Sequence, residues 1–181
     1  MATPKSRETS ILLLLLLLVL LFRLFTLQMI NEGPDEIDYW SSAVRLFDDL
    51  PYPELTHRTV RWPIIIPTAI FGSLVGFHPV GYYITPILLS LIQSFILFRW
   101  LSRHMAKVEG ETAIGSVVAA AVLAVALLTL FPYMWRAGSQ VRPEIYSLTY
   151  VLASLSLLWR WLAEPDRRRF LYLTALLLFV A

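Results

Sequence analysis

The chain has 181 residues, of which 57% are hydrophobic and 15% are charged, with a formal net charge of +2 and no cysteine. Soluble domains have an apolar share of about 45–50%, so this composition indicates an integral membrane protein. The lack of cysteine excludes a disulfide framework, cysteine-ligated zinc and a thiol nucleophile. The small net charge gives no indication of nucleic-acid binding.

The first apolar run predicts a membrane span over about residues 10–30. A helix needs about 20 residues to cross a bilayer, and the run lacks the small-residue cleavage site of a signal peptide. We therefore expect an uncleaved anchor. Arg23 lies near the far end of this run, and we expect its long side chain to reach the membrane surface. The alternative is a contact inside a helix bundle.

Residues 31–61 predict a polar external loop that contains a short helix. Ile37, Trp40 and Val44 recur at helical spacing, which is typical of an amphipathic helix at a membrane surface. The next segment, 62–77, is apolar but short for a span and carries two prolines and two glycines. We expect it to be interfacial rather than membrane-spanning.

Further spans are predicted over 81–100, 112–133 and 145–162, with polar turns at 101–111 and 163–169. A last apolar run, 170–181, is too short for a span, so we expect the chain to be the N-terminal part of a longer protein and inactive by itself. The fold class predicted is an all-α, polytopic membrane protein. Tyrosines and tryptophans near span ends are expected in the interfacial belts.

The distribution of basic residues predicts the orientation in the membrane. If 62–77 does not cross, three basic groups fall on one side, in agreement with the positive-inside rule. These groups are Lys5 and Arg7, then Arg99, Arg103 and Lys107, then Arg160 and Arg167 to Arg169. We expect the N-terminus in the cytoplasm and the loops 31–61 and 134–144 outside. The protein would be a multi-pass protein of a bacterial cell (inner) membrane.

Three carboxylates are candidates for chemistry on the outer face. Asp35 and Glu36 follow a Gly-Pro turn directly after the first span, and Glu144 lies at the outer start of the 145–162 span. Adjacent carboxylates repel, which raises the pKa of one of them and suits a general base. The alternatives are a solvated acidic turn for the pair and a favourable helix-dipole contact for Glu144.

Three arginines in the external loops are candidates for binding a phosphate: Arg58, Arg61 and Arg142. External loops do not need arginine for topology, and a guanidinium binds phosphate through two parallel hydrogen bonds. The alternative for Arg58 and Arg61 is an ion pair with an acidic residue of the same loop. No set of residues has the ligand spacing of a metal site.

The layout and three motifs resemble a known enzyme family. The motifs are "GPDEIDYW" opening the first external loop, "RWPIIIPTAIFG" before the second span and "VRPE" at the start of a later span. Together they resemble the GT-C membrane glycosyltransferases, and most of all the protein O-mannosyltransferase and aminoarabinose-transferase-like group, glycosyltransferase family 39. The resemblance covers nearly the whole chain in layout and implies a GT-C-like helical bundle.

The resemblance also implies an activity. A sugar would pass, with inversion, from a polyprenyl-phosphate carrier to a lipid, glycan or protein acceptor on the non-cytoplasmic face. The other partner expected is membrane lipid, and no nucleic acid is expected to bind. Asp35 or Glu36 would be the catalytic base and Glu144 a second acid, while Arg58, Arg61 and Arg142 would bind the donor phosphate. The cofactor stays open, and the spacing gives no support for a divalent metal.

Two other classes of protein are alternatives: a polytopic transporter and a non-catalytic membrane scaffold. A transporter places its ionisable residues within the spans near the midplane. Here, apart from Arg23, the ionisable residues that are candidates for function lie at the outer interface, which favours the enzyme.

Overall fold

The computed structural model describes residues 4–26, 34–46, 56, 61–109, 114–131, 142–164 and 167–181. Within these residues the chain forms helices and no strand, so the all-α prediction is confirmed for the described part. The helices are α1 (Pro4–Phe25), α2 (Pro34–Arg45), α3 (Trp62–Val75), α4 (Pro79–Glu109), α5 (Ile114–Leu130), α7 (Pro143–Ala163) and α8 (Arg169–Val180).

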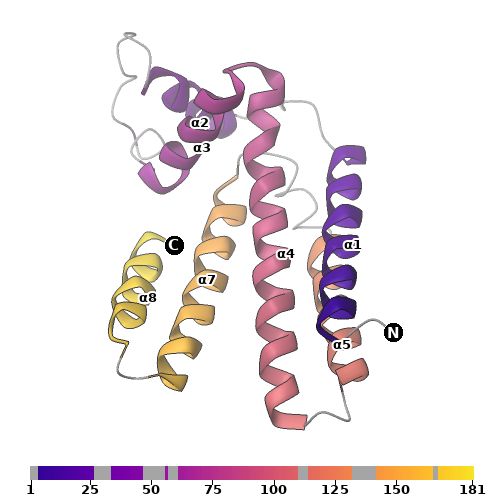
Figure 1. The fold of residues 1–181 in the computed structure, drawn as a ribbon. Helices are drawn as coiled ribbons and strands as arrows, with labels where there is room; N and C mark the ends of the chain where they lie inside the picture. The colour runs from indigo at the N-terminus through magenta and orange to yellow at the C-terminus, as the bar shows by residue number, and fades with distance from the viewer. Residues whose placement is uncertain are drawn as a thin grey trace.

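The helices form a bundle with two distinct ends (Figure 1). Helix α4 is central: α1 and α5 pack on one side of it and α7 on another, and α8 packs against α7. The short helices α2 and α3 pack together at one end, beside the starts of α4 and α7, and we call this the upper end. The lower end holds the starts of α1, α5 and α8 and the ends of α4 and α7.

Two of the described helices are long and apolar enough to cross a membrane, Ser6–Phe25 and Val80–His104. Three apolar helical segments are shorter than a span: Trp62–Val75, Gly115–Leu130 and Arg169–Phe179. Helix α7, with 21 residues, covers the predicted span 145–162 and is long enough to cross, but it is not one of the two helices that are also apolar enough. The number of spans therefore remains a prediction.

The lower half of the bundle is held together by a stripe of aliphatic side chains. Leu12, Leu15 and Val19 of α1 pack against Phe98 of α4 and against the small side chain of Ala121 of α5. Their spacing of three and four residues places them on one face of α1. Small residues let helix backbones approach closely, which favours packing inside a membrane.

Arg23 lies inside the bundle, which contradicts the expectation that it reaches the membrane surface. Only 2% of Arg23 is exposed. The reason is its position on the helix, because Arg23 follows Val19 by four residues and so continues the face of α1 that packs inward. The alternative of a contact within the bundle is the one that agrees with the structure.

Two further expectations need correction. Tyr39, Tyr82 and Tyr146 are at most 1% exposed, so these tyrosines near helix starts belong to the core and not to an interfacial belt. Helix α4 also continues to Glu109, so most of the polar turn expected at 101–111 is helical.

Candidate functional site

A tight turn at the upper end connects α3 to α4. Gly76 ends α3 with φ of 102°, a conformation that glycine adopts without the clash of a side chain. A Cβ on Gly81 would lie 2.1 Å from the carbonyl oxygen of Gly76, so the two backbones meet where only glycine fits. The turn folds α3 back beside the start of α4 and next to α2.

Helix α2 is present as predicted, but its inward face differs from the apolar face seen in the sequence. Tyr39, Ser42 and Ala43 are fully buried, whereas Ile37 is 46% exposed. Trp40 makes edge-to-face ring contacts with Phe77 and with Tyr82, whose ring centroids lie 5.8 Å and 5.4 Å away. These contacts hold α2 against the α3–α4 turn.

Arg61 stands immediately before α3 and reaches across to α2. It occupies the N-cap position, and Pro63 follows in the first turn, where a missing N–H costs nothing. Its Nη1 donates a hydrogen bond to the hydroxyl of Tyr39, and its guanidinium carbon lies 5.7 Å from the centroid of the Tyr39 ring. The contact fixes this cation at the upper end.

Two tyrosines of α7 tie that helix to α3. The hydroxyl of Tyr150 donates a hydrogen bond of 2.6 Å to the carbonyl oxygen of Pro63. The hydroxyls of Thr68 and Tyr146, both buried, are hydrogen-bonded to each other. The sequence alone predicts an interfacial belt position for tyrosines near the start of this span, whereas Tyr146 and Tyr150 connect α7 to α3.

A pocket of about 350 Å³ opens between the starts of α3 and α7. We call it the upper pocket. It is lined by Arg61, Pro63, Ile64, Pro143, Tyr146, Ser147, Tyr150 and Ala181. One guanidinium and several hydroxyl groups thus surround a space of the size that small-molecule sites have, about 300–1,000 Å³. The hydroxyls of Ser147 and Tyr150 already donate to carbonyl oxygens, so the group in this lining that can neutralise and hydrogen-bond an anionic oxygen is the guanidinium of Arg61.

The acidic pair lies at the same end of the bundle. Asp35 and Glu36 occupy the first turn of α2, and their side chains lie outside the described part of the structure. Asp35 precedes Tyr39 by four residues, so the backbone places it one helical turn from the residue that Arg61 contacts. Arg58 also lies outside the described residues.

Glu144 and Arg142 flank the upper pocket without lining it. Glu144 lies in the first turn of α7, and its Oε2 atom is buried. Arg142 is the N-cap residue, with an extended backbone and no side-chain capping hydrogen bond. Pro143 between them does line the pocket. The structure therefore brings Arg61 and the start of α7 together, with Glu144 beside them.

No three His, Asp or Glu residues of the described ranges lie close enough together to hold a metal ion.

Comparisons of the chain with protein-family models, with curated proteins and with solved structures found no match in any of the three.

Proposed function

We propose that this chain forms part of a membrane-embedded inverting glycosyltransferase whose donor is a sugar linked to a polyprenyl phosphate. The observation that carries the proposal is the upper pocket, where Arg61 faces the start of α7 at the end of the bundle that also bears Asp35 and Glu36. A cation for the leaving phosphate and a carboxylate for the acceptor are the two groups that this reaction needs.

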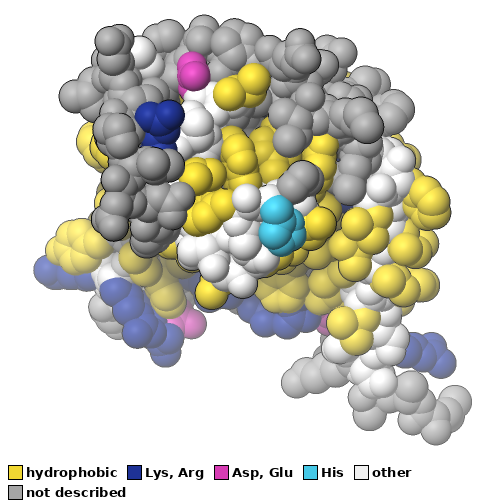
Figure 2. Space-filling model, turned by 90° about the horizontal axis from the view of Figure 1, so that it is seen from above, with side chains coloured by type: hydrophobic (Ala, Val, Ile, Leu, Met, Phe, Trp, Pro, Cys, Tyr) yellow, Lys and Arg dark blue, Asp and Glu magenta, His cyan; other side chains and the backbone are white. Residues whose placement is uncertain are grey.

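The surface of the bundle supports the membrane part of the proposal. Large apolar side chains are exposed along three helices that lie on the outside of the bundle, α1, α5 and α8. Examples are Leu13 at 62% exposed, Leu127 at 63% and Phe179 at 90%. Soluble monomers rarely expose apolar patches larger than a few hundred Å², whereas lipid chains solvate such a surface. Seen from above in Figure 2, hydrophobic side chains also occupy the centre of the described upper end.

The proposed reaction is a single displacement. A carboxylate of Asp35 or Glu36 takes the proton of the acceptor hydroxyl, and the acceptor oxygen attacks the anomeric carbon of the sugar. The bond between that carbon and the phosphate oxygen breaks on the opposite face, so the configuration inverts. The polyprenyl phosphate leaves with the bonding electrons, and Arg61, with Arg58 and Arg142, stabilises its charge. Glu144 would orient the acceptor or the donor.

The test uses membranes that contain the longer protein of which this chain is proposed to form part. It measures transfer of a radiolabelled sugar from a polyprenyl phosphate, and photo-crosslinking of a benzophenone-bearing polyprenyl phosphate. Replacing both Asp35→Asn and Glu36→Gln should lower transfer about 100-fold or more, the usual contribution of a general base, and leave crosslinking unchanged. Asp38→Asn removes a carboxylate from the same helix and should change transfer by less than about threefold. Transfer that survives the double substitution would exclude the pair as the base.

Arg61 is tested separately, because it also contacts Tyr39. Arg61→Gln should raise the KM for the lipid donor and weaken crosslinking. Tyr39→Phe removes the same hydrogen bond and keeps the cation, so it should leave both quantities near their original values. If Tyr39→Phe reproduces the loss, Arg61 acts by supporting the fold and does not bind the phosphate.

A further inference from the structure

A second pocket, of about 410 Å³, lies at the lower end of the bundle. We call it the lower pocket. Its walls come from the ends of α4 and α7 and from the start of α8. The lining residues are Arg99, Trp100, Arg103, Ser156, Trp159, Arg160, Ala163, Glu164 and Phe170. None of them belongs to the proposed glycosyltransferase site.

Positive charge is concentrated in the lower pocket. Three guanidinium groups line it, and Arg99 is paired with Glu8 of α1 at 2.8 Å. The carboxylate of Glu164 is turned to Arg167 at 2.7 Å. Within the described residues, no carboxylate lies at ion-pair distance from Arg103 or Arg160, although Glu8 also attracts Arg103 at longer range. Like charges held around one cavity repel each other, and an anion in the cavity would relieve this repulsion.

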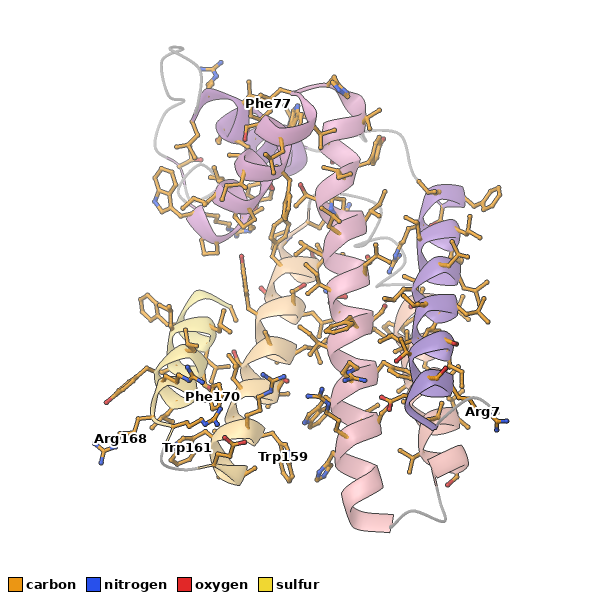
Figure 3. The ribbon with its side chains drawn as sticks, in the orientation of Figure 1. Arg7, Phe77, Trp159, Trp161, Arg168 and Phe170 are labelled. Carbon is orange, nitrogen blue, oxygen red and sulfur yellow. The ribbon has the colours of Figure 1, made fainter. Side chains whose placement is uncertain are left out.

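Three aromatic rings, those of Trp100, Trp159 and Phe170, also line the lower pocket. The imidazole of His104 lies 4.0 Å from the ring centroid of Trp159 and is stacked parallel to Trp100 at 6.3 Å, so one aromatic stack joins α4 to α7. Figure 3 shows Trp159 and Phe170 at this end, where α7 ends and α8 begins; Trp161 is nearby but does not line the pocket. Tryptophan is typical of the depth at which lipid headgroups meet acyl chains.

We propose that the lower pocket binds the phosphate headgroup of an anionic phospholipid. The part of α4 that is long and apolar enough to cross a membrane ends at His104. If it does cross, Arg99 and Arg103 lie in its last turns, at headgroup depth. Basic pockets between membrane helices are known to bind anionic headgroups. Exposed leucines on α7 and α8, such as Leu162 and Leu173, provide apolar surface for the acyl chains. A soluble phosphate would gain nothing from this apolar surface.

Native mass spectrometry of the purified chain in a neutral detergent tests the proposal with phosphatidylglycerol as the probe. Arg103→Gln with Arg160→Gln should weaken phosphatidylglycerol binding about tenfold or more, because two charge-assisted hydrogen bonds are lost. The matched control is Arg7→Gln with Arg168→Gln, which removes two exposed charges from the same end outside the pocket (Figure 3). The control should change binding by less than about twofold.

Glu8→Gln should raise the affinity for phosphatidylglycerol, whereas the arginine substitutions lower it. The reason is that Glu8→Gln releases Arg99 from its ion pair. Misfolding would not raise the affinity. Equal weakening by the pocket and control substitutions would show general charge attraction and overturn the proposal. Binding of phosphatidylcholine as tight as that of phosphatidylglycerol would overturn the headgroup selectivity. Displacement of the lipid by an equal concentration of inorganic phosphate would show a free-phosphate site instead.

Discussion

Among single residues, the buried polar side chains were the hardest to predict from the sequence. Arg23, Gln93 and Tyr146 are each at most 2% exposed, although each type is common at a membrane surface. A helix that is apolar all round has no periodic pattern to mark its buried face. Packing against the other helices therefore decides whether a polar side chain on such a helix is buried, and no pattern within the helix's own sequence predicts it.

Gln93 allows a test of how such a buried residue contributes to stability. Its Nε2 donates hydrogen bonds to the carbonyl oxygen of Ile145 at 2.7 Å and to Oγ1 of Thr149 at 2.8 Å, which joins α4 to α7. Gln93→Leu keeps most of the volume and should lower the free energy of unfolding by about 1 kcal/mol, since hydrogen bonds between membrane helices average about 0.6 kcal/mol. Unfolding in mixed detergent micelles measures the change.

A double-mutant cycle with Thr149→Val isolates the pair. The two substitutions together should cost less than the sum of the single costs. Strict additivity would mean that the hydrogen bond seen between Gln93 and Thr149 contributes nothing to stability.

At the scale of helices and turns, the sequence predicted where helices occur better than where they end. Apolar runs and helical spacing indicate the described helices other than α3, for which the sequence predicts only an interfacial segment, 62–77. Pro34, Pro63 and Pro143 lie at or next to helix starts, as proline favours. The end of α4 was missed because the residues after Trp100 are polar yet good helix formers. The upper pocket could not be predicted, since Arg61 and α7 are about 80 residues apart in the chain and the contact depends on the turn between α3 and α4.

That turn is sensitive to a single methyl group. Gly81→Ala would place a Cβ 2.1 Å from the carbonyl oxygen of Gly76, so the backbone of the turn must move. We expect a loss of about 1–3 kcal/mol, the usual cost of overpacking, and a changed tryptophan fluorescence because Trp40 lies next to Gly81. Thermal unfolding in detergent, followed by circular dichroism, measures the loss.

Gly115→Ala is the matched control for Gly81→Ala. A Cβ on Gly115 meets no atom within 4 Å, and alanine is the better helix former, so stability should stay equal or rise by up to about 1 kcal/mol. A similar loss in both variants would show that alanine is unfavourable at helix starts in general and that the contact between Gly76 and Gly81 has no special role.

For the whole molecule, the distribution of charge predicts the arrangement in the membrane. The lower pocket brings arginines of α4 and α7 together at one end of the bundle. The ion pair between Glu8 and Arg99 places the start of α1, with its basic residues, at the same end. Helix α3 lies with α2 at the other end (Figure 1). The positive-inside rule assigns the lower end to the cytoplasm, and the upper pocket would then face outward.

Because the chain has no cysteine, single-cysteine variants can report this orientation directly. Ser73→Cys lies on α3 at the upper end, and Ser6→Cys and Ala163→Cys lie at the lower end; all three positions are exposed. In intact cells, a membrane-impermeant maleimide should label the Ser73→Cys variant and should label the other two only after permeabilisation. The reverse pattern would place the lower end outside and contradict the positive-inside assignment. Labelling of all three in intact cells would mean that the bundle does not separate two aqueous compartments.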